Sequence, residues 1–152
     1  MKWKLSEDKS SLAIICEPGD DLNSSIVSAC TDSGFGSGFI VSCIGALKKA
    51  NITAIISTDG GFVYDKSKVI EGALEMVVLS GNVQPKVDGG WKTHMHALLV
   101  HENDCVYSGH LDDTNNIVGV TAEILIMKFP GLVRGKPTPQ GPSFIQFTDQ
   151  QE

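Results

Sequence analysis

The hydrophobic pattern of the chain changes period once, and this change restricts the fold more than any other feature. Only residues 20–34 place apolar side chains at helical spacing, at Leu22, Ile26, Ala29 and Cys30. Asp20 or Asp21 can cap the start of this helix, and Gly34 can end it. The later apolar runs are rich in strand-forming residues. An early helix followed by many strands predicts an α+β fold, with a largely antiparallel β-sheet and one main amphipathic helix.

The expected strands are separated by glycine, proline or polar turn residues. They comprise residues 12–16, 37–44, 50–57, 73–79, 93–100, 117–129 and 143–147. Gly45 interrupts the second of them and is typical of a bulge or a close backbone approach. The segment 143–147 is expected to close the fold as an edge strand. The chain has no internal repeat and no interdomain linker, so its 152 residues are expected to form one domain, 1–152.

Composition argues against nucleic-acid binding, membrane insertion and secretion. The chain has 18 acidic residues against 12 lysines and arginines, a net charge of -6, which is unfavourable for binding phosphate backbones. No apolar run approaches the roughly 20 residues of a membrane helix, and residues 1–11 do not form a signal peptide. The cysteines form no C-x-x-C pair and are expected to be reduced and mostly in the core. These observations predict a cytoplasmic protein, with the nucleus as the alternative.

The four histidines of the chain all lie between residues 94 and 110. His94 and His96 are two apart in an expected strand, so both side chains leave the same face. Residues 102–104 can form a three-residue hairpin loop. His101 then pairs with Cys105, and the residue numbers of every opposed pair in this hairpin add to 206. His96 therefore lies directly opposite His110, with Cβ atoms about 4.5–5.5 Å apart. His94, His96 and His110 are therefore expected to converge.

This convergence depends on the loop length. A two-residue loop would place Leu111 opposite His96 and separate the three imidazoles. His101 has the opposite parity to His94 and His96 and is expected on the other face of the sheet. By the same parity Cys105 is not expected to join His110 as a fourth ligand.

Three imidazoles with open positions are a typical site for zinc or a similar divalent ion. Neutral imidazoles do not balance the charge of the ion, so a nearby carboxylate is expected, with Glu123, Asp112 and Asp113 as candidates. An isolated H-x-H is ordinarily polar surface or a hydrogen-bonded core pair, but the third histidine in cross-strand register favours a metal. The cupin motif is excluded because Glu102 comes six residues after His96, instead of four or five.

A longer pattern resembles one family of small proteins. The matching segments are Pro18–Leu22, Ser42–Leu47, Glu71–Gly72, Glu75–Gly81, His94–His96, Ser108–Leu111 and Thr121–Glu123. In this order, over roughly residues 10–130, they resemble the plants-and-prokaryotes-conserved (PPC) domain. Residues 131–152 then form a C-terminal tail that contains the closing strand. Ser108 departs from the pattern, because family members commonly carry glycine there.

The resemblance implies a homotrimer built around a β-sheet with one prominent helix. It also implies a metal at the three-histidine site, carried by His94, His96 and His110. Plant members join the domain to AT-hooks and bind DNA in the nucleus. Prokaryotic members are usually single domains that are often labelled as predicted DNA-binding proteins. Independently, one helix cannot cover both faces of a sheet with the apolar runs Val77–Leu79 and Ile124–Met127, which favours burial between subunits.

These observations leave two classes of function. The first is a metal-binding, trimeric domain with an oligomerisation or regulatory role, for which DNA binding would follow the family label. Residues 133–137 come within one residue of an AT-hook core, but they lack basic flanks and are interpreted as a turn. The second class is a zinc-dependent hydrolase or small-molecule-binding protein, in which Glu123 or Asp112 would handle a proton. The sequence shows no evident nucleophile paired with a general base, and this favours binding over catalysis.

Overall fold

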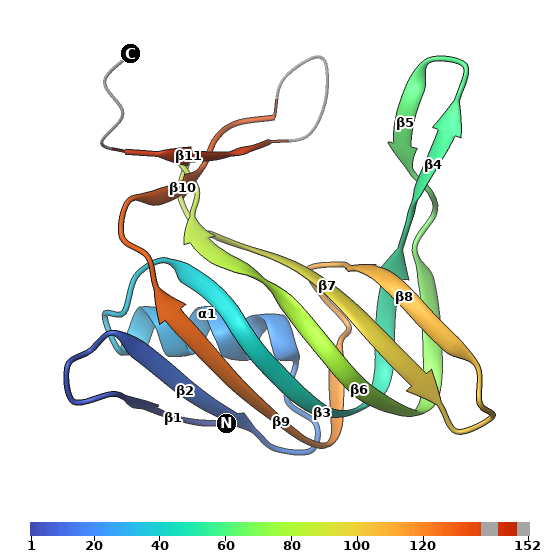
Figure 1. Ribbon diagram of the computed structural model, residues 1–152, viewed down its shortest axis with the longest axis horizontal. Coiled ribbons are helices and arrows are strands. Elements are labelled where there is room, and N and C mark those ends of the chain that lie inside the picture. Colours follow the sequence, from blue (N-terminus) through green and yellow to red (C-terminus); the bar gives the residue numbers. More distant parts are fainter. Residues whose placement is uncertain (138–142, 149–152) are drawn as a thin grey trace.

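The computed structural model describes residues 1–137 and 143–148. In this part of the chain there are one helix and eleven strands (Figure 1). They are β1 (Lys2–Leu5), β2 (Ser11–Cys16), α1 (Leu22–Asp32), β3 (Gly38–Thr53), β4 (Ile55–Thr58), β5 (Gly61–Tyr64), β6 (Lys68–Pro85), β7 (Trp91–His101), β8 (Val106–Leu111), β9 (Ile117–Lys128), β10 (Leu132–Arg134) and β11 (Ile145–Phe147).

Seven strands form one sheet in the order β1-β2-β9-β3-β6-β7-β8, and every neighbouring pair is antiparallel. The sheet curls until the end of β3 also pairs with β8, through Ile52 with Leu111 and Thr53 with His110. Helix α1 lies against one face of the sheet (Figure 1). The predicted α+β class, with a largely antiparallel sheet and one main helix, is confirmed.

Helix α1 has the sequence signals expected of it. Asp21 is the N-cap and accepts a hydrogen bond from the Ser24 backbone N–H at 2.9 Å. Gly34 follows the helix with a φ of 63°. The apolar positions of the helical pattern are all buried, as are alternate residues of the neighbouring strands. The core therefore lies between α1 and the concave face of the curled sheet.

The expectation that residues 37–57 form two separate strands, 37–44 and 50–57, is corrected by strand β3. It runs without a break from Gly38 to Thr53, and the second expected segment is divided between the end of β3 and β4. Gly45 does not end the strand. It adopts a φ of 145° at a register shift with β9 and lies so close to that strand that an added Cβ would be 2.1 Å from the Thr121 carbonyl oxygen. The expected bulge and close approach are both present.

Two hairpins project in the same direction from opposite sides of the main sheet (Figure 1). One pairs β4 with β5 around the turn at Asp59-Gly60, and the other pairs β10 with β11. The expectation that residues 143–147 close the main sheet is wrong, because β11 pairs only with β10. Strand β1 was not expected from the sequence. No helix in the described ranges is long and apolar enough to cross a membrane.

Candidate metal centre

The hairpin β7–β8 sets the register on which the site depends. The His101 backbone N–H donates to the Cys105 carbonyl at 2.8 Å, and Asp104 adopts a φ of 64° within the connection. The loop therefore has three residues, and the paired strand positions run from Val100 with Val106 to His96 with His110. The expected cross-strand register is confirmed.

The structure brings His94, His96 and His110 together. One ring nitrogen from each lies within 4.8 Å of the others, and the two Nε2 atoms of His94 and His96 are 3.3 Å apart. The ring centroids are separated by 5.1–5.4 Å. Because the odd-numbered residues of β7 face the core, these rings lie on the opposite face of the sheet. His96 is exposed and the other two are partly buried.

Burial keeps two of these imidazoles neutral. It lowers the pKa of His94 to about 4, and the charges of His110 and Arg134 act in the same direction. Burial also lowers the pKa of His110, although Asp112 and Asp113 oppose the shift. Neutral imidazole is the form that binds a metal, so no proton has to be displaced from these rings near pH 7.

The chemistry of the three histidines suits a metal ion. The Nδ1 atom of His110 is buried and has no hydrogen-bond partner among the described residues. A buried nitrogen without a partner is costly. Three imidazoles whose ring nitrogens converge are also the donor set that zinc accepts in sites with an open position. The residues present therefore suit a divalent ion.

The three carboxylate candidates differ in their placement. Asp112 follows β8 directly and accepts a short hydrogen bond from the Ser67 hydroxyl. Asp113 pairs with Lys92, two residues before His94. Glu123 is exposed on β9, which two intervening strands separate from β7, or about 14 Å at the usual strand spacing. The structure brings the two aspartates near the histidines and does not bring Glu123 there.

His101 and Cys105 both lie outside the cluster. The His101 Nε2 atom is 3.1 Å from the Glu71 carbonyl oxygen, and its ring contacts Tyr107. Cys105 is exposed at the hairpin loop, and the other three cysteines are buried. The positions expected from strand parity are therefore found for both residues.

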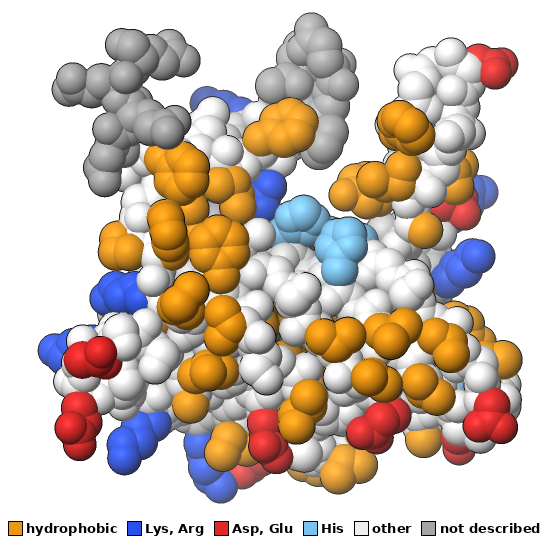
Figure 2. Space-filling view, in the orientation of Figure 1, with side chains coloured by type: hydrophobic (Ala, Val, Ile, Leu, Met, Phe, Trp, Pro, Cys, Tyr) orange, Lys and Arg blue, Asp and Glu red, His pale blue; other side chains and the backbone are white. Residues whose placement is uncertain are grey.

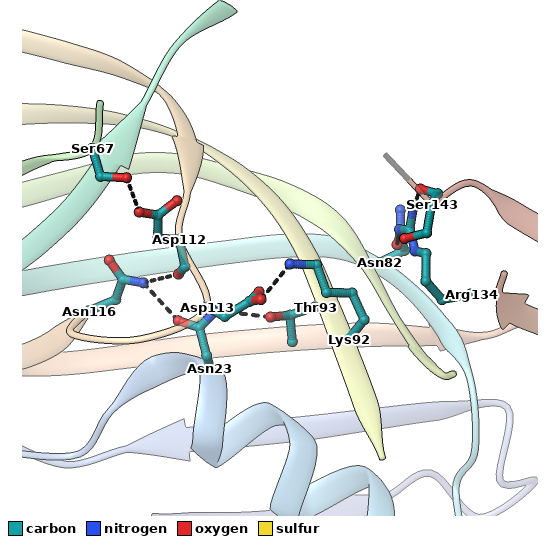
Figure 3. A network of polar contacts seen from close by, with 10 residues as sticks. All are labelled: Asn23, Ser67, Asn82, Lys92, Thr93, Asp112, Asp113, Asn116, Arg134 and Ser143. Atoms are coloured by element: carbon teal, nitrogen blue, oxygen red, sulfur yellow. Dashed lines mark hydrogen bonds and ion pairs between the residues drawn. The ribbon is translucent and has the colours of Figure 1, made fainter. Parts of the chain in front are cut away.

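A network of neutral amides, which sequence analysis missed, supports the site (Figure 3). The Asn116 amide donates to the Asn23 side chain at 2.8 Å and to the Asp112 carbonyl at 2.6 Å. Asn23 donates in turn to the Thr93 hydroxyl at 2.9 Å. These bonds tie the start of α1 to residues adjoining His94 and His110. Asparagine carries no spacing signal in the sequence that would have revealed this role.

A pocket of about 350 Å³ opens beside the histidines. In Figure 2 the pale blue histidines lie in the hollow between the two projecting hairpins. The lining residues come from both hairpins and from β7 and β8: Tyr64, Lys92, His94, His110, Arg134, Pro137, Ser143 and Phe144. Of these residues, only His94 and His110 were predicted from the sequence to belong to the site.

The AT-hook-like segment has a structural role. Leu132–Arg134 is strand β10 and not a turn, and the Arg134 side chain is only 6 % exposed. Its guanidinium donates to the Ser143 carbonyl at 3.0 Å and to the Asn82 side chain at 3.3 Å. A side chain held in this way is not free to enter a DNA minor groove.

Residues 6–130 match the family model of the Plants and Prokaryotes Conserved (PCC) domain. This is the family, also abbreviated PPC, that the sequence motifs resemble. The match covers most of the chain and includes all three histidines of the cluster. No curated protein sequence matches the chain.

Solved structures share the fold over nearly the whole length of the chain. A plant- and prokaryote-conserved (PPC) protein of Pyrococcus horikoshii is 25% identical, with a TM-score of 0.73, covering 99% of this chain and 97% of its own. A Bacteroides thetaiotaomicron protein, described as a "putative DNA binding protein", is 19% identical, with a TM-score of 0.77 and 96% of each chain covered. A metal-containing protein of Archaeoglobus fulgidus is 24% identical, with a TM-score of 0.72, covering 95% of this chain and 96% of its own.

Proposed function

The chain belongs to the Plants and Prokaryotes Conserved domain family, and from that premise we propose that it is an oligomeric domain that binds a divalent metal ion. Zinc is the expected ion, and His94, His96 and His110 are its ligands. The observation that carries the proposal is the convergence of three ring nitrogens within 4.8 Å. The Archaeoglobus fulgidus protein, which contains metal and has this fold, supports the same reading.

The surroundings of the cluster favour a binding site over a hydrolytic one. A zinc ion in a three-histidine site supplies Lewis acidity at an open coordination position. Hydrolysis would also need a group that takes up a proton in the same cavity. The described lining of the pocket contains no carboxylate, and the two nearby aspartates already have partners, Asp112 the Ser67 hydroxyl and Asp113 the Lys92 ammonium. A zinc-dependent hydrolase is therefore the second candidate function. The observation that favours it is the open pocket beside the histidines.

The outer face of the sheet supports self-association. In Figure 2 orange apolar side chains lie across the face opposite to α1. Alternation along the strands buries Ile124 and Ile126 and leaves Leu125 and Met127 exposed, and a register shift in β6 leaves both Val77 and Val78 exposed. An apolar face of this kind marks an interaction surface. We expect the assembly to be a trimer, as the family resemblance implies.

We expect light scattering at micromolar concentration to give three times the mass of one chain. Replacing Met127 by glutamate would put a charge into the proposed interface and should reduce the mass to that of a monomer. Ser28→Glu, on the exposed side of α1, is the matched control and should leave the mass unchanged. A wild-type monomer at this concentration would contradict the proposed assembly.

Direct DNA binding is expected to be weak or absent at moderate salt. The net charge of -6 opposes phosphate contacts, and the Arg134 side chain is buried. A gel shift with AT-rich and GC-rich duplexes at low and moderate salt would check this expectation. An AT-preferring shift that is lost in Lys136→Ala or Arg134→Ala would show that the segment 133–137 reads DNA.

A further inference from the structure

Arg134, in the pocket beside the histidines, is a buried positive charge that forms no ion pair within the part of the chain that the structure describes. The side-chain and backbone groups that bind the Arg134 guanidinium are all neutral. They are Ser143, Asn82 and Gln84, whose amide oxygen accepts from Nε and Nη2 at 3.0 Å each when it faces the guanidinium. No acidic side chain of residues 1–137 or 143–148 forms an ion pair with Arg134.

This arrangement differs from the other cation in the pocket. Lys92 forms an ion pair with Asp113. Arg134 is the more deeply buried of the two, and a charge taken from water without an opposite charge is costly. Nε and Nη2 already donate to the amide oxygens of Gln84 and Asn82, whereas Nη1 donates only to the Ser143 carbonyl among the described residues and has a second N–H that can donate to a carboxylate. The unmatched guanidinium therefore points to an anionic ligand.

The remaining walls indicate the rest of that ligand. Tyr64, from the β4–β5 hairpin, has its ring centroid 5.4 Å from that of His110. Phe144 and Pro137 line the pocket from the segments that flank β10 and β11. Both aromatic side chains are substantially exposed on their hairpins. Aromatic and apolar walls around a few polar groups are typical of a small-molecule site, and the volume lies at the small end of the range for such sites.

We propose that this pocket binds a small organic acid, with the carboxylate facing the histidines and Arg134 and an apolar or aromatic body between Tyr64 and Phe144. The inference rests on the proposed metal centre for part of the positive charge. It adds the chemical class of the ligand and the residues that select it. Arg134, Tyr64 and Phe144 would thus be specificity-determining residues contributed by the two projecting hairpins.

The test measures, by titration calorimetry, the binding of benzoate to the zinc-loaded full-length protein. Benzyl alcohol has the same ring without the charge, and acetate has the charge without the ring. We expect benzoate to bind at least about tenfold more tightly than either, because a charge-assisted hydrogen bond and an aromatic contact each contribute to affinity. Removing zinc should weaken benzoate binding by a similar factor.

Variants then locate the site. Tyr64→Ala and Phe144→Ala should each raise the Kd for benzoate roughly two- to tenfold, with zinc content unchanged. Phe62→Ala removes a ring from the same β4–β5 hairpin but outside the pocket lining, and it should have no effect. Arg134→Gln should raise the Kd about tenfold. Because Tyr64 and Phe144 are exposed, their variants remain informative if Arg134→Gln does not fold.

The outcomes separate the two proposals. Zinc-loaded protein that does not distinguish benzoate from benzyl alcohol, or that binds benzoate equally well in Tyr64→Ala and Phe144→Ala, overturns the ligand assignment and leaves the metal centre intact. Wild-type protein that retains no zinc after dialysis overturns the metal centre, and the ligand assignment with it. Selective benzoate binding that depends on zinc, Tyr64 and Phe144 supports both.

Discussion

Replacing His96 or His110 by alanine should greatly weaken metal binding. A site of three imidazoles that loses one keeps two ligands, and even the loss of an outer hydrogen-bonding partner costs 10–100-fold in affinity. We therefore expect the affinity for zinc to fall by at least about 100-fold in each variant. The measurement is metal content by elemental analysis after dialysis, with competition against a chromogenic chelator for the affinities.

The chain offers a matched control for this experiment in its fourth histidine. His101 lies at the end of β7, but its ring contacts the Glu71 carbonyl oxygen and Tyr107 and not the cluster. His101→Ala should keep the metal content of the wild type. Equal zinc content in His96→Ala, His110→Ala and the wild type would refute the ligand assignment. Loss of zinc in His101→Ala alone would do so as well.

Gly45→Ala should strongly destabilise the fold. Gly45 has a φ of 145°, which L-amino acids with a side chain rarely adopt, and a Cβ atom there would lie 2.1 Å from the Thr121 carbonyl oxygen and 2.8 Å from the Ala122 Cα. Strand β3 would have to move away from β9 in the centre of the sheet. Backbone strain and steric overlap each cost about 1–3 kcal/mol, so we expect the free energy of unfolding to fall by about 3 kcal/mol or more.

Urea unfolding at a fixed protein concentration would measure this change. Gly60→Ala is the control, because Gly60 lies in the exposed β4–β5 turn without a positive φ and a Cβ there would meet nothing nearer than 4.0 Å. Its effect should stay within about 0.5 kcal/mol, the usual range for surface substitutions. Similar stabilities for Gly45→Ala and Gly60→Ala would show that β3 tolerates a side chain at the bulge.

The part of the site that could be predicted is the part fixed by local geometry. Side chains alternate along a strand, and a three-residue loop sets which positions face each other, so His94, His96 and His110 could be brought together from their numbers alone. The helix N-cap at Asp21 could be expected for a similar reason, since capping depends on the residue and its immediate neighbours.

The part that could not be predicted depends on strand order and on packing between distant segments. Glu123 was a candidate neighbour of the metal because nothing in the sequence indicates that β3 and β6 lie between β9 and β7. Arg134 and Tyr64 reach the pocket only because their hairpins rise on either side of it. Strand β1 was missed because Lys2–Leu5 is short and carries two lysines, and it forms by pairing with β2.

The curling of the sheet, which lets the end of β3 pair with β8, also affects how copies of the chain can meet. The outermost strands of an open sheet expose unpaired N–H and C=O groups that can recruit strands from other molecules and start aggregation. Here β3 occupies part of the free side of β8, and the opposite border, β1, carries Lys2 and Lys4. Both borders are thus poor templates for adding another strand. Association between copies should therefore proceed face to face through side chains, which favours closed assemblies of limited size over fibres.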